Sequence, residues 1–165
     1  MKKLFSIALL LFTAGTAFSQ LSITELYKIP VKTKEDCKKA EPEILKAANL
    51  VLSKPIDDND GVLAGAYLLV WAQNSEHSFT FDANISKLSK KKANTMLLCV
   101  YLAALTKFIL ENPDKEKDTK AATIYTYTKL ADYVANANNH VKKTKDIKKL
   151  IAAKTNNTIA AYCGY

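Results

Sequence analysis

The longest apolar run in the chain extends from Met96 to Leu105, where ten consecutive residues are apolar, cysteine and tyrosine included. A helix with one solvated face would show polar residues at every third or fourth position of such a run. The run therefore predicts a helix over residues 94–111 that is buried on most sides, with the rest of the chain packed around it. A membrane-spanning helix needs roughly 20 apolar residues with few charges, and Lys107 and Glu111 follow the run closely. We expect a core helix and no transmembrane segment in the mature chain.

Four further segments show the apolar periodicity of amphipathic helices. They begin near Thr33, Asp60, Thr119 and Thr144, and a shorter one follows Asp82. In the third of them the predicted buried stripe consists of residues 121, 124, 125, 128, 131 and 134. Strand-like alternation is confined to residues 79–81, which is too little for a sheet. The predicted fold is all-α, a compact bundle of about five to six helices.

A weak internal repeat relates the segment 49–72 to the segment 107–130. At this constant offset Pro55 corresponds to Pro113 and Asp60 to Asp118, and each proline follows an apolar triplet and precedes a charged stretch. The repeat predicts two α-hairpins, each a helix, a proline turn and a second helix, arranged around the central helix 94–111. Pro42 lies inside the first helical segment, where we expect it to separate the first turn or to kink the helix.

The segment 1–19 has the pattern of a secretory signal peptide, with two lysines, a mostly apolar stretch over positions 4–12 and small residues before the predicted cleavage after Ser19. No cysteine follows the cleavage site, so we expect no lipid anchor. The mature chain is predicted to be periplasmic or secreted. Residues 20–32 are expected to form an extended arm or a disordered tail, and residues 33–165 a single helical domain.

Lysine is the only strongly basic residue of the chain. Two of the 24 basic residues leave with the signal peptide, so 22 bases and 16 acids give the mature chain a formal charge of +6. Bidentate recognition of base edges and phosphates is mainly arginine chemistry. Because arginine is absent and export is predicted, we expect no nucleic-acid partner.

The lysines gather in two clusters. The first consists of Lys87, Lys90, Lys91 and Lys92, and the second of Lys142, Lys143, Lys145, Lys148 and Lys149. The second cluster covers one short amphipathic segment and is a candidate contact with anionic surfaces. A solvated basic face is the alternative interpretation.

Three cysteines, Cys37, Cys99 and Cys163, leave two arrangements open. Cys99 lies in the apolar run and is expected to be an inert core side chain. In an oxidising compartment Cys37 and Cys163 could form a disulfide that closes the domain end to end, and three free thiols are the alternative.

The sequence contains no pattern that predicts a catalytic residue, a metal site or a cofactor. The acidic stretch 57–61 lacks the end ligands of a calcium-binding loop and is better explained as a turn with a helix N-cap. His77 and His140 have no other ligand at metal-binding spacing. His77 lies among serine and glutamate residues, so we expect a solvated side chain.

Tyr127 is a candidate interface aromatic. It falls off the buried stripe predicted for its helix, which indicates an exposed ring. Exposed tyrosines are common in protein interfaces.

Two stretches carry a resemblance to a known group of proteins. AYLLVWAQNSEHSFTF (residues 66–81) and LAALTKFILENPDKEKD (residues 102–118), with the lysine-rich ending, resemble small exported bacterial helical proteins that have no assigned function. The resemblance covers most of the mature chain and implies a helical fold and an exported location. It contains no chemical motif and implies no functional residue.

The leading functional hypothesis is an exported soluble helical protein that binds another envelope protein through a groove between its hairpins. One alternative is a small cell-wall glycan hydrolase, whose paired carboxylates would come from residues such as Glu41, Glu43 and Glu76. The other alternative is a basic protein that coats anionic surfaces.

Overall fold

The computed structural model describes residues 22–165, which contain helices and turns and no strand. The predicted all-α class is therefore confirmed, whereas the predicted signal peptide 1–19 lies outside the described residues. The five long helices are α2 (Lys34–Ser53), α3 (Asn59–Asn74), α5 (Leu97–Glu111), α6 (Thr119–Ala135) and α7 (Lys145–Thr155). The shorter elements are α1 (Ile23–Leu26), α4 (Ala83–Ser89) and α8 (Ile159–Tyr162), with 3-10 turns η1 (Lys92–Asn94), η2 (Pro113–Lys115) and η3 (Ala137–Asn139).

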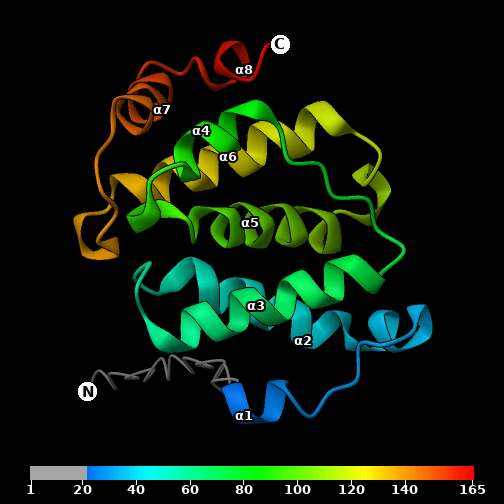
Figure 1. Ribbon diagram of the computed structural model, residues 1–165. Coiled ribbons are helices and arrows are strands. Elements are labelled where there is room, and N and C mark those ends of the chain that lie inside the picture. The colour runs from blue at the N-terminus through cyan, green and yellow to red at the C-terminus, as the bar shows by residue number, and fades with distance from the viewer. Residues whose placement is uncertain (1–21) are drawn as a thin grey trace, which may run out of the picture.

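Helix α5 lies at the centre of the fold. Figure 1 shows it between α2 and α3 on one side and α4 and α6 on the other, with α7 and α8 outside α6. Eleven of its 15 residues are buried, from Leu97 to Ile109. The stretch Lys92–Glu111 is long and apolar enough to cross a membrane by length and composition, a property that buried core helices share with membrane spans. The predicted central helix is confirmed.

The two predicted hairpins are α2–α3 and α5–α6. Helices α2 and α5 end at Ser53 and Glu111, two positions that the repeat offset pairs with each other. The N-caps of the second helices are Asp58 and Asp118, whereas the repeat offset pairs Asp118 with Asp60. The structural counterpart of Asp118 is therefore Asp58 rather than Asp60, because the turn that contains η2 is longer than the turn between α2 and α3.

Side-chain caps explain where the helices begin. Thr33 forms a capping box with Asp36, and the Asp58 carboxylate accepts a hydrogen bond from the Gly61 amide at 3.0 Å, which confirms the turn and N-cap interpretation of residues 57–61. Pro42 lies within one continuous helix α2, so it does not separate the first turn. Caps and proline turns fix the ends of the elements locally.

Gly65 allows α3 to approach α5 closely. A Cβ atom at this position would lie 2.8 Å from the Cβ of Cys99, closer than real side chains come. The glycine therefore serves packing against the central helix, at the cost of a weaker helical preference.

Residues 22–32 differ from the extended arm or disordered tail expected from the sequence. They form the single turn of α1 and a loop, and Leu26 and Val31 are buried. The Tyr67 hydroxyl donates to the Ile29 carbonyl at 2.6 Å, and the Asn74 side-chain amide donates to the Val31 carbonyl at 2.9 Å. Two apolar anchors and two hydrogen bonds from α3 hold this segment on the domain.

All three cysteines are free, so the disulfide alternative is wrong in this structure. Cys37 is buried on α2, where its thiol donates to the Val31 carbonyl, and Cys163 follows α8. Burial raises the pKa of the Cys37 and Cys99 thiols, and it raises the pKa of Cys163 to about 11. Protonated thiols are poor nucleophiles at neutral pH.

When the protein is purified without reductant and then denatured, we therefore expect three reactive thiols per chain. The measurement is colorimetric thiol counting in guanidinium chloride. A Cys163→Ser variant serves as a control and should give two thiols with an unchanged unfolding midpoint. One thiol in the wild type would restore the Cys37–Cys163 disulfide.

Candidate functional site

A cleft with a volume of about 960 Å³ runs along α5. Tyr101, Leu105 and Ile109, which follow one another at helical i, i+4 spacing on α5, form its apolar floor. One wall comes from the first half of α2 and the other from η2 and the start of α6. We name this feature the α5 cleft.

The connection between α3 and α4, residues 75–82, crosses the α5 cleft and is named the strap. The Phe79 ring packs edge-on against Trp71, with ring centroids 5.7 Å apart. The Tyr101 hydroxyl donates to the Thr80 carbonyl at 3.1 Å, so the floor of the cleft holds the strap from below. The alternating residues 79–81 therefore form an extended segment outside any sheet.

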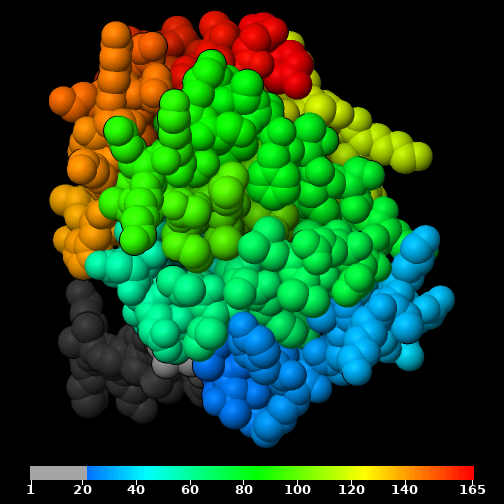
Figure 2. Space-filling model, in the orientation of Figure 1, coloured from blue at the N-terminus to red at the C-terminus, as the bar shows by residue number. Residues whose placement is uncertain are grey.

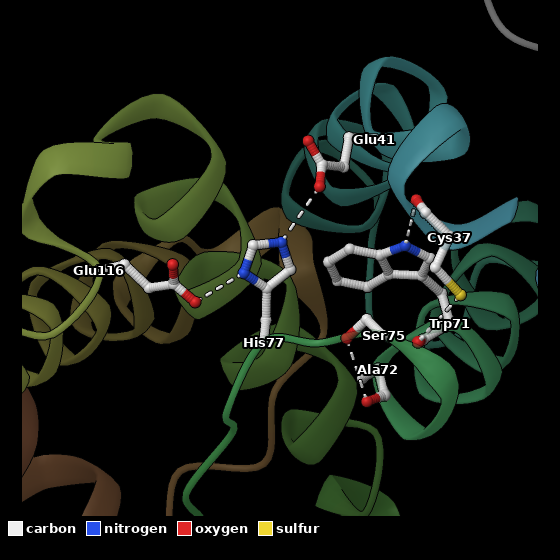
Figure 3. Close-up of polar contacts among 7 residues, drawn as sticks. All are labelled: Cys37, Glu41, Trp71, Ala72, Ser75, His77 and Glu116. Atoms are coloured by element: carbon white, nitrogen blue, oxygen red, sulfur yellow. Dashed lines mark hydrogen bonds and ion pairs between the residues drawn. The ribbon is translucent and has the colours of Figure 1, made fainter. Parts of the chain in front are cut away.

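His77 ties the strap to both walls of the cleft. Its Nε2 lies 3.2 Å from an oxygen of Glu41 on α2, and its Nδ1 lies 2.7 Å from an oxygen of Glu116 beside η2. Figure 3 shows the imidazole ring between the two carboxylates. A protonated ring donates from both nitrogens, whereas a neutral ring donates from one.

The expectation of a solvated His77 is therefore wrong. Its side chain is 18% exposed and is enclosed by Trp71 and Phe79 as well as by the two glutamates. Glu41 and Glu116 lie 36 and 39 residues away in the sequence. No local pattern around His77 could indicate these partners, because the tertiary fold alone brings them together.

The other carboxylates of the cleft also have partners. Glu76 pairs with Lys34 at 3.7 Å on the surface. The Asp82 carboxylate accepts hydrogen bonds from the amides of Asn84 and Ile85 at the start of α4, and one from the Tyr127 hydroxyl at 2.5 Å. None of these acids is left as an isolated group in the cleft.

Tyr127 is fully buried, so its prediction as an exposed interface aromatic is wrong. Its ring packs between Tyr101 and Tyr162, at centroid distances of 5.5 and 5.6 Å. Helix α6 is covered by α5 on one side and by α7 and α8 on the other. Of the predicted stripe only residues 131 and 134 are buried, whereas 121, 124, 125 and 128 are half-buried. The buried face of α6 is turned toward Tyr127 and Leu130, which the periodicity placed outside.

The remaining predicted residues lie away from the cleft. His140 is exposed and contacts Asp57 at 2.9 Å. This contact lowers the pKa of Asp57. All five lysines of the second cluster are exposed on or just before α7. No group of three metal-ligating side chains occurs within residues 22–165.

Comparisons with protein families, with curated proteins and with solved structures give no match for this chain.

Several buried tyrosines make the fold sensitive to high pH. Burial raises the pKa of Tyr67 and of Tyr162 to about 12, and it raises the pKa of Tyr101, Tyr127 and Tyr133 as well. Because the folded chain holds these protons more tightly than the unfolded chain, their stabilisation is complete below pH of about 10 and is lost as pH rises toward 12.

We expect the free energy of unfolding to fall steeply above pH of about 10, measured by urea denaturation across the alkaline range. Tyr67→Phe should make this fall shallower, because one buried group that takes part in it is gone. Tyr165→Phe is the control, since Tyr165 is 47% exposed. If the free energy of unfolding fell equally steeply with pH in the wild type and in Tyr67→Phe, Tyr67 would not be one of the groups that cause the fall.

The two histidines allow a matched test of the bridge across the cleft. His77→Asn removes both carboxylate contacts and should lower the free energy of unfolding by about 1–2 kcal/mol. His140→Asn removes a contact that is 58% exposed and should change it by less than about 0.5 kcal/mol. Asparagine tolerates the left-handed backbone at position 140, where φ is 53°.

Chemical denaturation measures both free energies, and hydrogen exchange of the strap amides gives a local readout. Faster exchange of residues 75–82 is expected in His77→Asn only. Equal exchange in the two variants would show that His77 does not hold the strap.

Proposed function

We propose that the chain is an exported binding protein and that the α5 cleft receives a segment of another envelope protein. The main support for this proposal is the cleft itself. Its volume of about 960 Å³ lies at the upper end of the range for binding pockets, about 300–1,000 Å³. Its floor belongs to the central helix, and its walls belong to both hairpins. This position between the hairpins supports the proposal that the cleft is the binding groove.

The lining of the cleft suits a peptide. Tyr101 and Leu105 offer apolar contact at the floor. Ser78 and Thr123 bring hydroxyl groups, and Lys38 and Lys117 bring charge at the walls. A peptide main chain has alternating donors and acceptors, and its side chains supply apolar and charged groups.

The carboxylate geometry favours binding over glycan hydrolysis. Glycoside hydrolases hold two carboxyl groups about 5–9.5 Å apart with open space for the scissile bond between them. Here the imidazole of His77 occupies the space between Glu41 and Glu116. Glu43, another acid considered for hydrolysis, pairs with Lys46 at 2.8 Å and does not line the cleft.

Site-specific photo-crosslinking in the producing bacterium tests the proposal. A photoreactive residue at Thr123 faces the cleft, whereas one at Thr128 lies on the same helix outside it. Both threonines are partly buried, and both donate to the carbonyl one helical turn earlier at 2.7 Å. We expect a discrete envelope-protein adduct from position 123 and none from position 128.

Filling the cleft provides the second arm of the experiment. Ser78→Trp should suppress the adduct from position 123, because Ser78 is exposed and lines the cleft. Gln73→Trp, on an exposed site of α3 outside the cleft, should leave it unchanged. Equal adducts from positions 123 and 128, or release of sugar fragments from purified peptidoglycan, would contradict a binding role for the cleft.

A further inference from the structure

The two lysine clusters, which α5 and α6 separate in the sequence, form one continuous surface in the fold. The Asn94 side chain joins them, because its amide donates to the Lys142 carbonyl at 3.0 Å and its oxygen accepts from the Lys142 amide at 3.1 Å. Helix α4 also contacts α7. Figure 2 shows the green atoms of the α4–η1 region beside the orange atoms of α7 at one edge of the molecule.

We name this surface the lysine face, and all nine of its lysines are exposed. Few acidic side chains neutralise the lysines of the face. Within the described chain its one ion pair joins Lys149 to Asp146 at 3.8 Å. The Lys143 ammonium group donates to the Val134 carbonyl, which leaves its charge in place. The members of the face are Lys87, Lys90, Lys91, Lys92, Lys142, Lys143, Lys145, Lys148 and Lys149.

The lysine face holds the whole positive excess of the domain. Residues 22–165 contain 22 lysines and 16 acids, and the face accounts for nine of these lysines and one acid, Asp146. The remainder of the domain has 13 lysines and 15 acids and is slightly negative. An ordinary solvated surface has both signs interspersed. Here the charge is separated into a basic face and a weakly acidic remainder.

The composition of the face indicates the kind of partner. None of its lysines lines the α5 cleft or the smaller hollow between α2, α5 and α6. The large exposed apolar side chains of the described chain are Tyr27, Val70, Phe81 and Tyr165, and none of them belongs to α4, η1 or α7. A face without a groove and without an inserting side chain suits adsorption on an extended anionic plane. A linear polyanion is usually followed by a groove.

We propose that the chain adsorbs to anionic phospholipid membranes through the lysine face, by electrostatic attraction without insertion. Lysine ammonium groups are hydrated point charges that interact with lipid headgroups without fixed geometry. The lysine face and the α5 cleft share no residue. This proposal is independent of the ligand of the cleft.

Vesicle co-sedimentation of the purified chain lacking the predicted signal peptide tests this proposal. The probes are vesicles of phosphatidylcholine and phosphatidylglycerol in equal parts, and vesicles of phosphatidylcholine alone. We expect binding to the first only, and release by molar salt, which shortens the screening length to about 3 Å.

The decisive variant changes the first cluster, which the sequence did not connect with the second. Replacing four lysines by glutamine is expected to weaken binding by at least about a hundredfold, since each lysine near an anionic surface contributes roughly fivefold. A control variant replaces four exposed lysines elsewhere and should bind within about threefold of the wild type. The test variant changes Lys87, Lys90, Lys91 and Lys92, and the control changes Lys32, Lys39, Lys115 and Lys120.

Three results would overturn the proposal. The first is absence of wild-type binding to the anionic vesicles. The second is an equal loss in the test and control variants, which would mean that net charge alone matters. The third is binding to dextran sulfate that anionic vesicles do not displace, which would assign the face to a linear polyanion. Unchanged helical circular dichroism of the test variant ensures that the comparison concerns folded protein.

Discussion

Burial of α5 on nearly all of its sides is the constraint on which the other packing depends. A helix without a polar face must be covered by several neighbours, so α2, α3, α4 and α6 surround it. Close packing around α5 requires small residues at the contacts. Gly65 on α3 is such a residue, and it lies against Cys99 of α5. Buried hydroxyls of Thr106 on α5 and Thr126 on α6 have no hydrogen-bond partner within the described chain. Each unpaired hydroxyl lowers the free energy of unfolding by about 1–3 kcal/mol, and the burial of apolar side chains has to outweigh this cost.

Tyrosines at the edge of this core fix the connecting segments. Tyr67, Tyr101 and Tyr133 donate to the main-chain carbonyls of residues 29, 80 and 54, in three different connections. Their rings contribute to the core while their hydroxyl groups reach the loops outside it. The strap receives a further tie, because His77 contacts carboxylates on both walls. The shape of the α5 cleft therefore follows from groups that hold a loop against the central helix.

Two surfaces with different physical character result from this arrangement. The α5 cleft is enclosed by both hairpins, contains charges of both signs and has its carboxylates engaged by internal partners. The lysine face is open, has one sign of charge and is joined by Asn94 between η1 and the segment before α7. Lysines separated along the chain repel one another when brought together. Such a cluster adds no stability to the fold, which is consistent with a role in contact with an anionic partner.

The sequence by itself determined the long helices and where they begin and end, whereas α1 was not expected. Ten consecutive apolar residues specify a buried helix, and Thr33, Asp58 and the proline turns act on neighbouring backbone, so these signals are local. Only the tertiary structure decided which side chains meet. Periodicity placed Tyr127 outside the buried stripe of α6, and only the tertiary structure brings Tyr101 and Tyr162 to both sides of its ring. His77 and its two glutamates, and the two lysine clusters, come together through contacts between distant residues, for which the chain carries no local signal.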